Sequence, residues 1–265
     1  MIKKKKKNFN FIAGMILVSL TLILLLWGMI GTPYDPDTMD NSLKFTGASV
    51  SHFMGCDHFG RDIFSRVLKG IGNTFTVALG TVFIGTVAGI ILGGFCGYFG
   101  GLLDEVLMRL NDAVFAFPSI FLALVVICLI GPGKYNVILA LGIAFIPSFA
   151  RIVRSEFMKE KNKEYVQSAK VMGAGSLRIM FFHILPNAFP VILSSVMIGF
   201  NNAVIAEAGL SYLGIGVQPP DASLGAMLSD AQTYLYSTPY MAVFPGAVMV
   251  MMILGFGLLA TGMEK

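Results

Sequence analysis

The sequence predicts an all-α integral membrane protein with six transmembrane helices. Hydrophobic residues make up 55% of the 265-residue chain and charged residues 13%, against about 25% charged residues in ordinary soluble domains. The mean hydropathy is +0.76. A helix needs roughly 20 apolar residues to cross a hydrocarbon core of about 30 Å. Six stretches meet this length, at residues 11–30, 76–99, 110–131, 135–153, 184–209 and 240–262.

The first and fourth stretches need separate justification. Lys3 to Lys7 could begin a secretory signal peptide, but the apolar region of a signal is about 7–15 residues long and ends at a small-residue cleavage site. This stretch runs from Phe11 to Ile30 and continues into Gly31-Thr-Pro33. We therefore predict a retained anchor, with a cleaved signal as the alternative. Pro147 is expected to kink the fourth stretch or leave it partly unwound.

Three parts follow along the chain. Residues 1–31 form the N-terminus and anchor helix, residues 32–72 form a polar loop that ends in an amphipathic helix, and residues 73–265 hold the other five spans. Apolar side chains at 63, 64, 67 and 68 define the amphipathic helix. It either lies on the outer membrane surface or against the first span, or it simply leads into the second span. The glycines at 85, 89, 93, 94 and 97 predict close packing of the second span against its neighbours.

Basic residues set the predicted orientation because they are enriched in cytoplasmic segments. With the N-terminus inside, 14 of the 19 Lys and Arg residues fall on the cytoplasmic side and 5 outside. Both termini are therefore expected in the cytoplasm. The net charge of +4 reflects this topology and does not indicate nucleic-acid binding. The cytoplasmic residues are Lys3 to Lys7, Arg109, Arg151, Arg154, Lys159, Lys161, Lys163, Lys170, Arg178 and Lys265.

A polar island separates the fourth and fifth spans. It reads Glu164-Tyr-Val-Gln-Ser-Ala-Lys-Val-Met-Gly173, and His183-Ile-Leu-Pro186 follows. Such a segment must face water rather than hydrocarbon. Its spacing resembles the cytoplasmic loop of ATP-binding-cassette (ABC) importer permeases, which runs E-A-A, three residues, G, nine residues, I-x-L-P. Gln167, Ser168 and Ala169 stand at the E-A-A positions, and Gly173 is the glycine.

The resemblance implies a type I ABC importer permease fold, with a cytoplasmic coupling helix within the loop at about 154–183 that docks on an ATPase subunit. The residues it assigns to this contact are Tyr165, Val166, Gln167, Ser168, Ala169, Gly173 and Ala174. Val166, Ala169 and Gly173 lie at i, i+3 and i+7, so we predict that their shared face enters a groove on the ATPase. A surface helix that tolerates change is the alternative. Gln167 replaces the usual acidic residue, so an ion pair from that position is absent.

Further landmarks narrow the resemblance. His52-Phe-Met-Gly-Cys-Asp-His-Phe-Gly-Arg-Asp62 is similar to the segment before the second span in dipeptide, oligopeptide and nickel permeases, and Glu207 to Pro220 is similar to the segment after the fifth. Gly97 to Gly101 and Ala116-Phe-Pro118 extend the similarity. These landmarks belong to the C-type permease, one of the two permease subunits in these systems. Cys56 stands where that family more often has threonine.

The resemblance also implies function and partners. The chain is expected in the cell membrane of a prokaryote, paired with a second permease, two ATPase subunits and an extracytoplasmic binding protein, and surrounded by lipid. Peptides are the expected solute, with nickel or a metal chelate as the alternative. No cofactor is expected. The subunit is not expected to be catalytic, because Lys134 lacks the rest of a phosphate-binding loop: Cys128 and Tyr135 stand where glycine and Ser or Thr are required.

Polar residues in the fifth span are candidates for the solute path. Asn201 and Asn202 lie about 20 Å along this helix from Ala188 at 1.5 Å per residue, hence past the bilayer middle. Amides are costly in lipid, so one could bond a neighbouring helix while the other lines the path, or both could bond helices. Glu207, near the outer end, is also assigned to the path.

Other sites and classes are less favoured. Cys56, Cys96 and Cys128 have no metal-type spacing and predict no disulfide. His52 and His58 flank Asp57, where loop hydrogen bonding is preferred to metal binding. A secondary transporter or channel would need ionisable groups inside the spans, which are nearly absent. An intramembrane enzyme would need a nucleophile and base facing each other, and no predicted span contains histidine.

Overall fold

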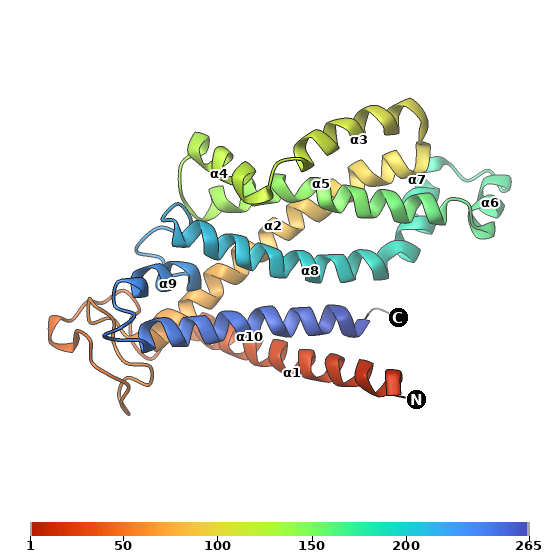
Figure 1. Cartoon of the computed structure of the whole chain (residues 1–265). Helices are drawn as coiled ribbons and strands as arrows, with labels where there is room; N and C mark the ends of the chain where they lie inside the picture. The colour runs from red at the N-terminus through yellow and green to blue at the C-terminus, as the bar shows by residue number, and fades with distance from the viewer. Residues whose placement is uncertain (1, 264–265) are drawn as a thin grey trace.

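The computed structural model describes residues 2–263, with side chains from Phe9 onward, and most of these residues are helical (Figure 1). The side chains of Lys3 to Lys7 and all of Lys265, which contribute to the predicted charge bias, lie outside this description. The helices are α1 (Ile2–Ile30), η1 (Asn41–Leu43), α2 (Ile63–Phe99), α3 (Gly101–Phe115), α4 (Ser119–Ile130), α5 (Lys134–Glu160), α6 (Glu164–Val171), α7 (Ser176–Arg178), η2 (Ile179–Ile184), α8 (Leu185–Tyr212), α9 (Leu224–Gln232) and α10 (Tyr240–Met263).

Five of the six predicted stretches correspond to single long helices. Among the described residues these are α1, α2, α5, the continuous run from α7 through η2 to α8, and α10, each long and apolar enough to cross a membrane. The prediction of one helix over 110–131 is wrong, because α3 and α4 meet there at 85°. Pro118 explains the break, since proline has no N–H to donate and its ring disfavours a helical conformation at the preceding residue. Counted together, the bent pair makes a sixth span.

The fourth span is continuous at its proline. We predicted that Pro147 would kink α5 or leave it partly unwound. The helix is not unwound, because α5 continues through Pro147 over its 27 residues, and the kink stays a prediction. The Pro147 carbonyl accepts a hydrogen bond from the Asn111 side chain of α3 at 3.3 Å. A backbone acceptor in the middle of α5 is thereby used to attach the bent pair to the rest of the bundle.

Helices α2 and α5 pack backbone to backbone, as the glycine pattern predicted. A side-chain β-carbon on Gly89 would lie 2.5 Å from the Cβ of Phe149, and one on Gly93 would lie 2.2 Å from the Ala150 carbonyl. One on Gly97 would approach the Arg154 carbonyl to 2.7 Å. Only glycine permits this approach, so larger residues at these positions would push α2 and α5 apart.

The molecule has two distinct ends (Figure 1). We call the end with the two chain termini and α6 the termini end, and the end with residues 31–62 and α9 the loop end. At the loop end, Ile63, Val67 and Leu68 are buried and Arg66 is only 4% exposed. The first turns of α2 are thus covered by the loop. They are covered by protein rather than lying on the membrane surface, and they lead directly into the second span. They also pack against the first span, as the other interpretation predicted: the Phe64 ring meets the Trp27 ring edge-on with centres 5.4 Å apart, and a β-carbon on Gly28 would lie 2.8 Å from the Leu68 carbonyl.

Candidate coupling helix and membrane pocket

Helix α6 at the termini end is short and polar on one side. Glu164 lies in its first turn and Lys170 in its last, which suits the helix dipole. Its other side is apolar and faces the chain itself: Val166 and Ala169 are buried in a cluster with Phe157 of α5 and Ile184 of η2. The second half of the sequence motif therefore packs beneath the first half and supports α6.

Gly173 of the motif is required to end α6. Its φ of +80° is in the left-handed region, which favours glycine. The N–H of Gly173 donates to the Lys170 carbonyl at 3.0 Å, and the N–H of Ala174 donates to the Ala169 carbonyl at 3.0 Å. These two bonds form a Schellman motif, which satisfies the last carbonyls of a helix. The Schellman motif needs a glycine four residues after Ala169, which explains the spacing between these two residues in the sequence motif.

Hydrogen bonds to Glu160, the last residue of α5, hold the start of α6. The Tyr165 hydroxyl donates to Glu160 Oε2 at 2.8 Å, and Lys163 Nζ lies 2.6 Å from Oε1. Burial, followed by the bond to the Glu160 carboxylate, raises the pKa of Tyr165 to about 12. Tyr165 therefore stays protonated at physiological pH and serves as an anchor for α6.

The outer face of α6 carries the residues that the sequence prediction passed over. Val171 is 90% exposed and Met172, which follows the helix, is 79% exposed. Gln167 and Ser168 are exposed beside them, and Ala174 is half-buried. The predicted shared face is wrong: Val166 and Ala169 lie in the chain's own core, and Gly173 lies beyond the end of α6. In the sequence, the feature that could have indicated the outer face is the adjacent apolar pair Val171 and Met172 within an otherwise polar segment.

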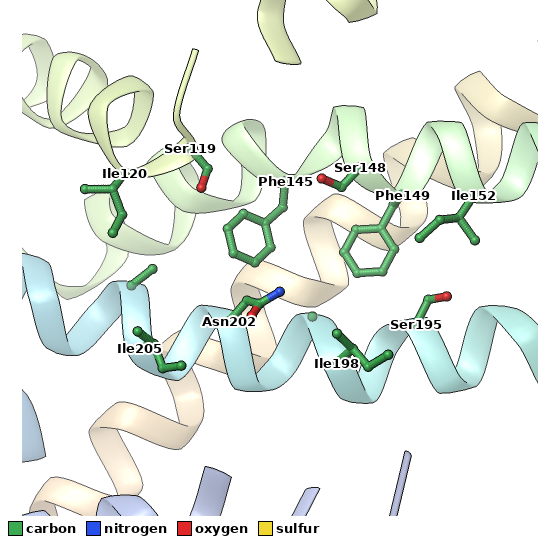
Figure 2. Close-up of a pocket in the computed structure, with 12 residues that line it drawn as sticks. Ser119, Ile120, Phe145, Ser148, Phe149, Ile152, Ser195, Ile198, Asn202 and Ile205 are labelled. Carbon is green, nitrogen blue, oxygen red and sulfur yellow. The ribbon is translucent and has the colours of Figure 1, made fainter. Parts of the chain in front are cut away.

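A pocket of about 340 Å³ lies between α4, α5 and α8 (Figure 2). Side chains from one face of α5 and one face of α8 point toward each other across it. Gly199 leaves space for the Phe149 ring, since a β-carbon there would lie 2.7 Å from Phe149 Cζ. The apolar lining includes Phe145, Phe149, Ile152, Ile198 and Ile205, and the polar lining consists of Ser119, Ser148, Ser195 and Asn202.

The two adjacent asparagines of α8 face different surroundings. Asn202 lines the pocket and is exposed in it. Asn201 is half-buried against α10, where a β-carbon on Gly257 would lie 3.1 Å from Asn201 Nδ2. Within the described residues, Asn201 Oδ1 is buried without a hydrogen-bond partner. Their 100° separation around the helix thus sends one amide to the pocket and the other to a neighbouring helix.

Comparison with known proteins identifies the family. Residues 85–265 match the family described as binding-protein-dependent transport system inner membrane component. The chain is 34% identical to the dipeptide transport system permease protein DppC of Alkalihalophilus pseudofirmus over 262 residues, which covers 99% of this chain and 86% of that protein. It is 37% identical to the glutathione transport system permease protein GsiD of Pectobacterium atrosepticum over 254 residues, covering 96% and 84%. The chain belongs to this permease family.

Solved structures support the predicted fold class of the permease. An inward-facing structure of the MetNI methionine ABC transporter matches with a TM-score of 0.60 at 19% identity, covering 76% of this chain and 97% of that chain. An amino acid ABC transporter matches with a TM-score of 0.57 at 19% identity, covering 74% and 91%. The predicted type I ABC importer permease fold is confirmed, and the protein is a multi-pass inner-membrane permease.

The Glu207 side chain of the permease is fully buried. Its carboxylate accepts hydrogen bonds from Ser211 at 2.6 Å and from Thr74 of α2 at 3.0 Å. Thr74 Oγ1 also accepts the N–H of Leu224, the first residue of α9. In this conformation Glu207 joins α8 to α2 and α9 and does not line the pocket, so its assignment to the path stays a prediction, as does that of Asn201.

The loop end of the permease is built around Asp57. Asp57 Oδ1 accepts the N–H groups of Phe59 and Arg61, and Oδ2 accepts Arg61 Nε at 2.6 Å. Gly60, at φ +78°, lies so close to the Asp40 carbonyl that a β-carbon would be 1.8 Å away. Asp57 and Gly60, both in the sequence landmark from His52 to Asp62, therefore fold a tight loop. His58 stacks on Tyr234 rather than facing His52.

The three free cysteines differ in their burial. Cys56 of the loop is fully buried, whereas Cys128 of α4 is exposed in the isolated chain. Burial, together with the charges of Asp62, Asp57 and Asp40, raises the pKa of the Cys56 thiol to about 11. Cys56 is thus an unreactive thiol despite its place in a loop.

Proposed function

We propose that this permease forms, with a second related permease, the membrane path of an importer for peptides. The observation that carries the proposal is the 34–37% identity, over nearly the whole chain, to permeases of dipeptide and glutathione transport systems. The pocket suits such a solute, because hydroxyl and amide groups can bond peptide groups while Phe145 and Phe149 contact apolar side chains.

A nickel or metal-chelate solute is the second candidate. The pocket lining contains serine, asparagine and apolar side chains, whereas nickel and similar ions prefer imidazole, thiolate and carboxylate ligands. This difference favours peptides over a bare metal ion for the path between α4, α5 and α8. A secondary transporter or channel is disfavoured by membership of a family of binding-protein-dependent permeases.

Two ATPase subunits supply the energy in this proposal, and the termini end faces the cytoplasm. The segment around α6 carries Lys159, Lys161, Lys163, Lys170 and Arg178, and basic residues concentrate on the cytoplasmic side. The outer face of α6, with Val171 and Met172, docks on an ATPase subunit. An extracytoplasmic binding protein delivers peptide at the loop end.

Rigid helices connect the docking face to the pocket. Helix α5 contributes Phe157 to the cluster beneath α6 and Phe145 to the pocket. The continuous run from Ser176 to Tyr212 likewise places Ile184 beneath α6 and Asn202 in the pocket. A displacement of α6 is therefore transmitted along both walls of the pocket, which can alternate between two openings when the ATPase subunits close.

The two asparagines provide a matched test of the path. In cells that carry the complete transporter, Asn202→Leu should change the uptake rate of a labelled dipeptide by about tenfold, which corresponds to 1.4 kcal/mol. Asn201→Leu should transport normally, because the amide it removes lies against α10. Both variants must assemble and support ATP hydrolysis. Native uptake of every tested peptide by Asn202→Leu would contradict the path, and uptake of Ni²⁺ without peptide would favour the second candidate.

A further inference from the structure

Three metal-ligand side chains meet in the loop between α1 and α2, far from α6 and outside the pocket. One ligand atom each from His52, Cys56 and Asp62 lies within 4.8 Å of the other two. All three residues are buried. Neither the path nor the coupling helix uses them, and their spacing in the sequence, with three and five residues between them along a loop, matches no metal motif.

The chemistry of this cluster is specific. An imidazole nitrogen, a thiolate and a carboxylate oxygen form a ligand set that zinc accepts, whereas Ca²⁺ and Mg²⁺ prefer oxygen ligands alone. We propose that His52, Cys56 and Asp62 bind Zn²⁺ at the loop end. A cavity of about 320 Å³, lined by His52 and Asp62 together with Tyr34 and Asp40, adjoins the cluster. It leaves room for a water molecule as the fourth ligand.

The geometry needs little adjustment to hold the ion. His52 Nδ1 lies 2.9 Å from Asp62 Oδ1. In a tetrahedral site with metal–ligand distances near 2.1 Å, these two atoms would be about 3.4 Å apart, so they must separate by about half an ångström. Asp62 Oδ2 accepts the N–H of Ser65 at 2.8 Å and can keep this bond. The sulfur must move inward by about 1 Å at most from the 4.8 Å limit.

Neighbouring groups orient the ligands. The Tyr34 ring stacks on the His52 imidazole with ring centres 4.6 Å apart, and Cys56 and Asp62 pair as an isolated β-bridge. Such outer contacts fix the orientation of metal-binding side chains. Because Asp62 also caps α2, a bound ion would tie the loop to the start of a transmembrane helix. The ion would thus stabilise the surface presented at the loop end.

Metal binding by the purified full-length permease tests this site. After equilibration with Zn²⁺ and removal of free ion, wild type should retain about one Zn²⁺ per chain. Co²⁺ in its place should give the visible absorption of a tetrahedral site and a thiolate charge-transfer band. Cys56→Thr, which is similar in size, should lose both signals. Cys128→Thr, on exposed α4, should keep them.

Further measurements decide the outcome. Zn²⁺ should raise the melting temperature of wild type and leave that of Cys56→Thr unchanged, while the metal-free proteins melt alike. If Cys56→Thr does not fold, His52→Gln replaces it and should lose the tetrahedral Co²⁺ spectrum. The proposal is overturned if wild type retains less than about a tenth of an equivalent of Zn²⁺, or if folded Cys56→Thr or His52→Gln retains as much as wild type. The cluster would then be a buried hydrogen-bonded pair beside a thiol.

Discussion

The loop at residues 31–62 and the coupling segment at residues 160–184 are both polar stretches between spans, yet they bury opposite kinds of side chain. The loop turns charges inward, so that Asp57, Arg61 and Asp62 are nearly inaccessible. The coupling segment turns apolar residues inward and leaves Val171 and Met172 exposed. Both segments also expose apolar side chains, Val50 and Phe53 in the loop and Val171 and Met172 in the coupling segment, so the difference between them lies in what each one buries.

This difference has a physical basis. Buried charges must find partners within the same chain, and Asp57 lies between Arg61 at 2.6 Å and Arg66 at 3.8 Å. An exposed apolar pair contributes no stability to the isolated chain, because apolar side chains stabilise a fold only when they are buried. We propose that the exposed pair of α6 is a protein contact, because it lies at the tip of a helix that the chain's own core supports. The loop is therefore held by ion pairs within the chain, and the outer face of α6 is proposed to meet a partner.

The largest expected effect comes from placing a charge in the inner face of α6. Ala169→Glu should destabilise the permease by about 4 kcal/mol or more, since Ala169 lies in an apolar cluster where a carboxylate would have no partner. The melting temperature of the detergent-purified chain measures this loss. Ser168→Glu, one residue away on the exposed face, is the matched control and should melt like wild type. Equal melting of the two variants would show that α6 is not anchored as described.

The corresponding change in the loop should have a smaller effect. Asp57→Asn removes the charge that faces Arg61 and Arg66 but preserves the shape of the side chain, so we expect a loss of about 2–3 kcal/mol. Thermal or denaturant unfolding measures it. Asp35→Asn, in the exposed part of the loop, should unfold like wild type. If both substitutions are equally mild, the buried ion pairs do not hold the loop.

Thiol labelling tests separately whether the loop is closed and on which side of the membrane it lies, and it changes the protein least. Val50 is 92% exposed and Cys56 is fully buried in the same loop. In intact cells, a membrane-impermeant maleimide should label Val50→Cys and leave Cys56 unmodified. In the metal-free protein, the pKa of about 11 also keeps Cys56 in its unreactive thiol form near neutral pH.

Two results would contradict this picture. Labelling of Val50→Cys only after lysis would place the loop end in the cytoplasm and invert the proposed orientation. Rapid labelling of Cys56 in the wild-type chain near neutral pH would mean that the loop is open rather than closed around Asp57.

Sequence alone identified the fold class and the coupling segment, because hydropathy and motif spacing are properties of composition and order along the chain. It did not predict the break at Pro118 or the unbroken α5 at Pro147, since the effect of a proline depends on neighbouring helices that the sequence does not display. Helical periodicity also gave two faces for α6 without indicating which one the chain itself covers. Val166 and Ala169 were assigned outward for that reason.

The candidate sites show the same limit. The sequence placed Asn201 and Asn202 in the fifth span but could not say which one faces the pocket, because that depends on the rotation of α8 against α10. The proximity of His52, Cys56 and Asp62 depends on the tight loop that Asp57 and Gly60 fold. Separation along the sequence could not reveal it.

Photo-crosslinking from two equally exposed positions tests the division between the two ends most directly. A crosslinkable side chain at position 171 in the assembled transporter should attach to an ATPase subunit, because Val171 lies on the outer face of α6 and is 90% exposed. The same group at position 50, which is 92% exposed, should attach to no ATPase subunit. An ATPase crosslink from position 50, or none from position 171 in a complex that still transports peptide, would contradict the account.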